Sequence, residues 1–216
     1  MSSHQPLPIA KDFSLITKPA QTWDQLAASQ RGWVFAFFYY LLPLILLAAV
    51  AEGCGLYRSG QEHLSLGASV NRFSSSRIIA FELVQWLMIF GLLALAAWCI
   101  KGFANACHRR NHSAQSVYLL VHGIGPLVLL KIFDGIPELN VWAIWFLGIM
   151  FTMSTLYHGV PRIMQPDPPS AFGLYIASAF TILFFSFIGR LLTYWYLNND
   201  SKLLNAGVAR LAAWIP

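Results

Sequence analysis

The sequence predicts an all-α membrane protein, a polytopic bundle of about five transmembrane helices with amphipathic interfacial helices near both termini. Hydrophobic residues make up 57% of the chain and charged residues only 11%, whereas a typical soluble domain carries about 25% charged residues. Five apolar runs also come close to the ~20 residues that a helix needs to cross a ~30 Å hydrocarbon core. None of these runs alternates as the strands of a membrane barrel do, so the spans are predicted to be helices.

The five predicted spans cover residues 32–51, 78–100, 117–133, 141–157 and 171–196. The third is the weakest, since it contains His122-Gly123-Ile124-Gly125-Pro126, where glycine and proline loosen or kink a helix. We expect the fourth to end at Tyr157, because Gly159 and Pro161 follow it and disfavour continued helix.

The spans divide the chain into three parts: a cytoplasmic segment with a short interfacial helix (1–31), a five-span domain (32–197) and an amphipathic C-terminal helix (198–216). In the first part, Pro19 suits the first turn of a helix that carries Trp23 and Leu26 on one face. In the last part, Leu204 and Val208 belong to an apolar stripe. The alternative for both terminal pieces is frayed chain.

Basic residues set the orientation of a membrane protein, and here they are divided almost evenly between the two sides. The cluster of Lys101, Arg109 and Arg110 lies in a short loop without an acidic neighbour. We therefore place that loop and the N-terminus inside and the C-terminus outside. This predicts a multi-pass integral membrane protein, located in the cytoplasmic membrane if its source is bacterial.

The candidate intramembrane polar residues are Glu82, His122 and Arg190. A charge in hydrocarbon is costly, so such groups tend to be paired or functional. Glu82 and Arg190 lie at similar depth on oppositely directed spans, and they could form a pair. Alternatively, Arg190 extends to the headgroups and Glu82 sits in headgroup water.

His122 lies near the middle of the third span, beside the expected kink at Pro126. A broken helix frees backbone carbonyls near the midplane, as in the binding sites of transporters. The alternative, which we favour, is a neutral histidine that forms a hydrogen bond with a tyrosine or threonine of another helix.

The sequence contains no convincing catalytic or cofactor site. It has no phosphate-binding glycine loop, no Gly-x-Ser-x-Gly elbow and no His-Glu-x-x-His pattern. Cys107, His108 and His112 are residue types that bind zinc, but no fourth ligand is nearby, and Arg109 and Arg110 repel a dication. We expect no enzymatic activity, no cofactor and no metal.

Three stretches together resemble the Yip-domain family of five-span membrane proteins, named for interaction with Rab-type GTPases. They are Lys18–Trp23 before the first span, Ser113–Pro126 at the third span, and Tyr157–Met164 followed by Pro166–Ala171. The short N-terminus is more similar to the prokaryotic branch of that family.

The resemblance implies a non-enzymatic protein that organises membrane or recruits partners, in trafficking or envelope upkeep. The alternative is a small transporter or channel component with a midplane site around His122 and Pro126. The expected partners are the lipid bilayer and another membrane or cytoplasmic protein, with no nucleic acid. Homo-oligomerisation is left open.

The loop after the fourth span is the candidate partner-facing surface. Its candidate residues are Tyr157, Gly159, Pro161, Arg162, Met164 and Pro166. Its prolines reduce the conformational entropy that a partner would have to remove on binding. We expect Met164 to lie outside the span and Ser170 to cap the fifth helix. The alternative is a connector that only fixes the last two spans.

The orientation gives a first test. A topology reporter fused after Pro216 should lie outside the cytoplasm, and one fused after Cys107 should lie inside, because five spans separate the termini and the second loop is basic. Paired alkaline phosphatase and fluorescent-protein fusions would measure this. Cytoplasmic activity of the C-terminal fusion would show that the span count or the orientation is wrong.

Overall fold

A computed structural model of the chain describes residues 8–29, 32–59, 75–106, 113–136 and 138–198, and every regular element in these ranges is helical. Five of its helical stretches are long and apolar enough to cross a membrane: Trp33–Tyr57, Ile78–Ala106, Ala114–Gly135, Val141–Ile163 and Ala171–Trp195. The predicted all-α bundle is confirmed. The amphipathic helix expected at 198–216 falls almost wholly outside the described residues.

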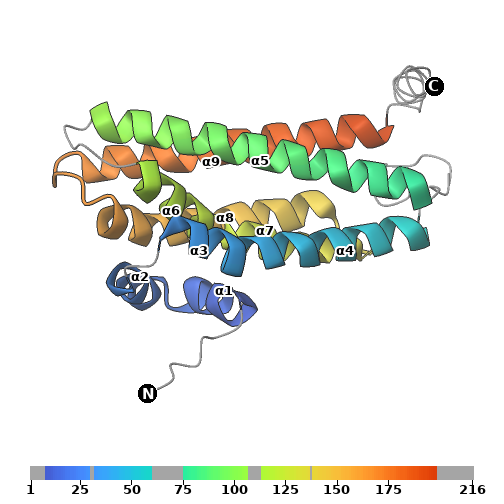
Figure 1. Cartoon of the computed structure of the whole chain (residues 1–216), viewed down its shortest axis with the longest axis horizontal. Helices are drawn as coiled ribbons and strands as arrows, with labels where there is room; N and C mark the ends of the chain where they lie inside the picture. Colours follow the sequence, from blue (N-terminus) through green and yellow to red (C-terminus); the bar gives the residue numbers. More distant parts are fainter. Residues whose placement is uncertain (1–7, 30–31, 60–74, 107–112, 137, 199–216) are drawn as a thin grey trace.

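The spans form a bundle in which α5 (Ser75–Ala106) and α9 (Ala171–Asn198) pack side by side (Figure 1). Beneath them lie the first span, formed by α3 (Trp33–Ala36), η1 (Phe37–Leu41) and α4 (Leu42–Ser59), and the third, formed by α6 (Ser113–Gly123), α7 (Gly125–Lys131) and η3 (Ile132–Gly135). The fourth span, α8 (Val141–Ile163), packs against α6, α7 and α9. Helix α8 therefore contacts both the α5–α9 pair, through α9, and the helices beneath it, through α6 and α7.

The first span contains a π-helical turn, η1, directly before Pro43. Proline has no backbone N–H and its ring crowds the carbonyl four residues earlier, so the preceding turn widens. This turn places Tyr40 in the core with its side chain almost fully buried.

The third span is broken at Ile124, between α6 and α7, as the glycines and Pro126 predicted. Pro126 stands in the first turn of α7, where its missing N–H costs no helical hydrogen bond. The break lets α7 follow α8 closely: a Cβ on Gly148 would stand 2.8 Å from the Cδ1 atom of Leu127.

The fourth span is longer than predicted, and the expectation that it ends at Tyr157 is wrong. Helix α8 continues through Pro161 to Ile163. A proline this close to the end removes only the bond to the Tyr157 carbonyl, so the helix survives it. The chain turns instead at Gln165, whose φ of 44° is the left-handed conformation typical of a helix C-terminus.

The sequence analysis did not assign the cap at the start of α8, and it expected Ser170 to cap α9. At its start, the Asn140 side chain accepts hydrogen bonds from the backbone N–H groups of Trp142 (2.9 Å) and Ala143 (3.2 Å). Ser170 stands before α9, where its carbonyl accepts the bond from Leu174, but its hydroxyl donates back to the Asp167 carbonyl.

Two helices, rather than the one expected, precede the first span: α1 (Pro8–Thr17) and α2 (Pro19–Ala28). Their corner is fixed by a hydrogen bond of 2.7 Å between the hydroxyls of Ser14 and Thr22. Helix α2 packs against α8 and α1 against α7, so this hairpin is part of the folded bundle.

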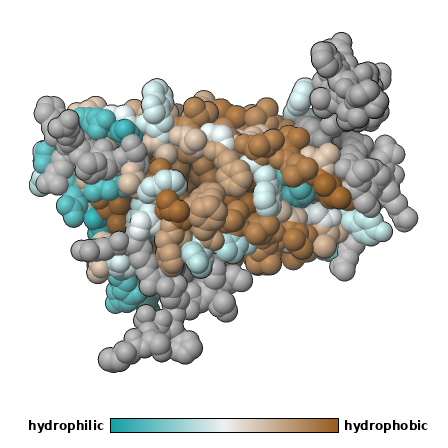
Figure 2. All heavy atoms as spheres, in the orientation of Figure 1, coloured by the Kyte–Doolittle hydropathy of each residue, from teal (hydrophilic) through white to brown (hydrophobic). Residues whose placement is uncertain are grey.

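The surface matches a chain that lies in a bilayer. Figure 2 shows hydrophobic residues over much of the middle of one face and hydrophilic residues gathered at its left end. That end is where α2 lies and where α8 finishes in Figure 1. The hydrophilic end is therefore the part of this face that is best suited to contact water-soluble groups.

Candidate functional site

Trp23 anchors the N-terminal hairpin to the bundle. Its side chain is 0% exposed, and its indole Nε1–H donates to the Thr155 carbonyl at 2.9 Å. Gly159 makes room for the ring, because a Cβ there would stand 2.6 Å from two Trp23 ring atoms. Two of the stretches that carried the family resemblance thus meet in one contact.

One helical turn further along α8, Arg162 forms an ion pair with Asp24, with 2.6 Å between its Nε and the carboxylate Oδ1. Its Nη1 also donates to the His158 carbonyl at 3.0 Å. In the structure Arg162 joins α2 to α8, on the side where Asp24 is largely exposed.

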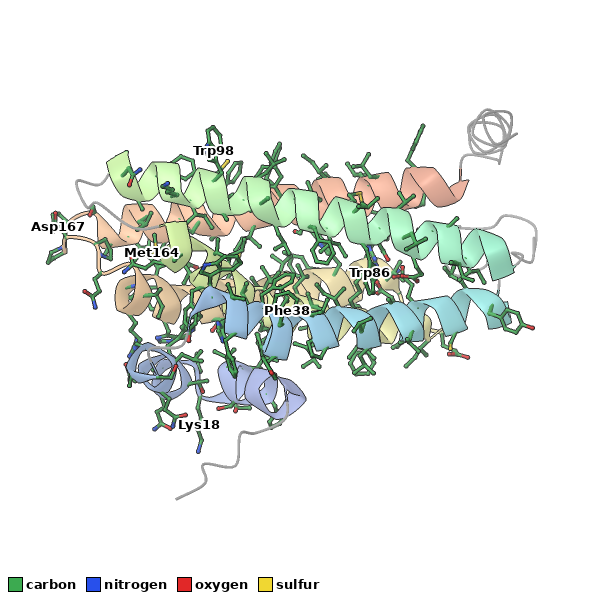
Figure 3. All side chains as sticks on the ribbon, viewed as in Figure 1. Lys18, Phe38, Trp86, Trp98, Met164 and Asp167 are labelled. Carbon is green, nitrogen blue, oxygen red and sulfur yellow. The ribbon has the colours of Figure 1, made fainter. Side chains whose placement is uncertain are left out.

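The six candidate residues of the loop do not share one surface. Tyr157 and Pro161 are exposed, and Arg162 and Pro166 are partly exposed. Gly159 lies beneath Trp23, and Met164 is only 1% exposed. Met164 does lie just beyond the span, which ends at Ile163, but its side chain packs into the core and is not available to the interface or a partner as we expected (Figure 3).

His122 lies in an enclosed cluster of rings. It stacks on Tyr40 at 4.8 Å between ring centroids, and Tyr118 and Trp23 contact it at 4.5 and 6.0 Å. Its Nδ1 is 3.1 Å from the Tyr118 carbonyl of its own helix, and the side chain is 1% exposed. This arrangement is closer to the structural interpretation of His122 than to an accessible midplane site, although Nδ1 faces a backbone carbonyl of its own helix and not a side chain of another helix.

Arg190 pairs with Asp134 rather than with Glu82. Its Nη1 and Nη2 donate to the two carboxylate oxygens of Asp134 at 2.7 and 3.2 Å. Nη2 also donates to the Val141 carbonyl at 2.8 Å, and the guanidinium lies 6.0 Å from the Trp142 ring. A bidentate contact of this kind is the strongest geometry for an arginine and a carboxylate.

A second ion pair lies at the same end of the bundle, between Lys131 of α7 and Glu52 of α4. The partly buried Glu82 of α5 also reaches this region, and a Cβ on Gly53 would stand 3.7 Å from its Oε1. Both Glu82 oxygens find no hydrogen-bond partner among the described residues. Of the two alternatives considered, the pairing of Glu82 with Arg190 is thus not what the structure contains.

Sequence reasoning missed Asp134 and Glu52 because each lies just beyond the predicted end of an apolar run. The first span ends six residues and the third span two residues beyond the predicted run, and this brings both carboxylates into the bundle. The first and third spans also approach each other closely at this end of the bundle, because a Cβ on Gly135 would overlap the Ala51 carbonyl oxygen.

These arrangements are suited to holding helices together. In the described part of the chain, no three His, Cys, Asp or Glu side chains gather in a way that could hold a metal ion. The weak candidate at Cys107, His108 and His112 lies outside the described residues. The best-formed surface is the polar end where α2 meets α8, and we take it as the candidate functional site.

The Arg190–Asp134 pair predicts a strong energetic coupling. Arg190→Gln and Asp134→Asn should each destabilise the protein by about 3 kcal/mol, because each leaves a buried partner unsatisfied. The double variant should cost less than the sum of the two. Unfolding of the detergent-solubilised protein would measure this, with Glu82→Gln as control. Coupling of Arg190 to Glu82 instead of Asp134 would contradict the assignment.

The Trp23 contact predicts a steric effect at Gly159. Gly159→Ala should destabilise by about 2 kcal/mol, because its methyl group overlaps the Trp23 ring. Gly91→Ala is the matched control, since a Cβ on Gly91 meets nothing within 4 Å. Adding Trp23→Leu should relieve part of the Gly159→Ala loss. Equal stabilities of the two alanine variants would exclude this packing.

The comparisons with known proteins agree with this geometry. A family model for the Yip1 domain matches residues 13–189, from within α1 to within α9, which is well over half of the chain. No curated protein and no solved structure matches. The match includes the Trp23–Gly159 contact, the broken third span and most of each helix in the bundle. The chain belongs to the Yip1 domain family.

Proposed function

We propose that this chain is a non-enzymatic membrane protein that recruits a partner protein at its polar end, and thereby organises the membrane around it. The observation that carries the proposal is the Trp23 anchor. Because the ring is fully buried and bonded to α8, the hairpin holds its outer face in a fixed position relative to the spans. The Yip1 family is not known as a family of enzymes.

The proposed partner surface, which we call the platform, consists of Lys18, Asp24, Gln25, Arg162 and Asp167. Four of these residues are exposed and Arg162 is partly exposed. Lys18 and Asp167 point away from the bundle (Figure 3). Charges of both signs give the directional contacts that specify a partner. The platform rests on helices and a proline-rich turn, so binding would cost little ordering entropy.

The surroundings of His122 favour recruitment over the alternative of a small transporter. A transport site near the midplane needs a polar, water-accessible cavity. Here aromatic rings from three other positions contact the imidazole, and the Pro126 turn is buried as well. Under the predicted orientation, the platform faces the cytoplasm, where a soluble or membrane-attached partner could reach it.

Site-specific photocrosslinking in native membranes tests the proposal. A photoreactive residue at position 25, an exposed platform position, should form adducts with a protein partner, and one at Glu138, which is exposed at the opposite end, should not. Lys18→Glu with Asp167→Lys should abolish the adducts while the melting temperature stays within about 2 °C, because exposed substitutions barely affect stability.

Two results would count against recruitment. One is an adduct pattern that is the same at position 138 as at the platform. The other is solute flux into proteoliposomes that is lost in a His122→Gln variant of unchanged stability, since that outcome would support the transporter alternative.

A further inference from the structure

A cavity of about 160 Å³ lies within the bundle, beneath α5 and α9 and against α7 and α8. Its lining runs from Gln85 to Ala96 on α5 and from Ile182 to Thr193 on α9, at spacings of three and four residues on each helix. Such spacings place the lining residues on one face of each helix. Most of this lining is apolar, so an empty cavity would be poorly hydrated.

The length of the lining matches one leaflet of a bilayer. Eleven residue steps along either helix correspond to roughly 17 Å at ~1.5 Å per residue. Half of a ~30 Å hydrocarbon core is ~15 Å. The cavity is also not fully enclosed, so its contents can exchange with the surroundings of the bundle.

One end of the cavity is polar and carries hydrogen-bond donors without acceptors. Arg190, Lys131 and Asp134 line this end, where Arg190 is paired with Asp134 and Lys131 with Glu52. Arg190 is 9% exposed, and its Nε finds no acceptor among the described residues. Trp145 also lines the cavity, and its buried indole Nε1 finds no acceptor there either. Buried donors left unpaired are costly, so their presence beside a cavity points to a ligand with acceptor oxygens.

We propose that this cavity binds one acyl chain of a membrane glycerophospholipid, whose ester or phosphate oxygens accept hydrogen bonds from Arg190 and Trp145. The apolar lining matches the chain, and the donors match the polar end of the lipid. Arg190 lies five residues before Trp195, where the fifth span ends. The polar end of the cavity therefore sits about 8 Å inside the span, close to the level of lipid ester groups.

The site would hold the lipid as part of the bundle and is separate from the platform. Its lining comes from four of the five spans, so a bound acyl chain fills a space that protein side chains leave open between the helices. Filling such a space restores the dispersion contacts that an empty cavity lacks.

The test uses the full chain in nanodiscs of phosphatidylethanolamine and phosphatidylglycerol, with a trace of phosphatidylglycerol that carries a diazirine on one acyl chain. After illumination, mass spectrometry should find adducts on cavity-lining residues of α5 and α9. Leu93→Trp should reduce these adducts to background, because it fills the cavity. Leu87→Trp is the matched control on α5, since Leu87 lines no part of the cavity and is 75% exposed.

A second variant tests the polar end without filling the cavity. Trp145→Phe keeps an aromatic ring but removes the donor, and it should weaken lipid retention about fivefold, as expected for one lost hydrogen bond. Trp98→Phe, at an exposed position of α5, should have no effect. Adducts confined to outward-facing residues of the wild-type protein would overturn the proposal. So would stronger labelling of the lining by a diazirine fatty acid than by the phospholipid.

Discussion

The packing of Trp23 against Gly159 is the constraint on which the polar end of this protein depends. The ring can be buried only because residue 159 has no side chain, and its N–H bonds a backbone carbonyl of the same helix. With the ring packed there, α2 lies along the last turns of α8, and Asp24 comes within reach of Arg162. Without this contact, α2 would be held against α8 by the weak surface pair of Arg162 and Asp24, and against α6 by the hydrogen bond from the Tyr118 hydroxyl to the Leu26 carbonyl.

The two ends of the bundle are held by different interactions. At the platform end, an aromatic ring and a glycine form the contact, and the nearby ion pair is largely exposed. At the other end, Arg190, Asp134, Glu52 and Lys131 form two ion pairs within the spans. Water cannot replace a lost partner there, so these pairs fix which helices meet, with the Val141 carbonyl joining α8 to the same arginine.

The sequence was sufficient to predict what hydropathy and backbone chemistry determine: five helical spans and the break beside Pro126. It did not predict which side chains meet. A pair of Arg190 with Glu82 was considered because their depths matched, but depth cannot tell which helices are neighbours, and Asp134 lay outside the predicted run. The end of α8 was misplaced for a related reason. Local preferences at Gly159 and Pro161 indicated a stop, whereas Gly159 is required by a ring 136 positions earlier in the chain.

Helix α8 connects these features. Its first residue supplies the carbonyl that Arg190 binds, Trp145 lines the cavity, and its last turns hold Trp23 and Asp24. It contains 23 residues, or about 35 Å at ~1.5 Å per residue, which exceeds the hydrocarbon core. Because Pro161 falls only in its last turn, the helix keeps its hydrogen bonds over nearly all of that length. The distance between the buried ion pair and the platform is therefore set by one continuous element, against which the hairpin packs through both α1 and α2.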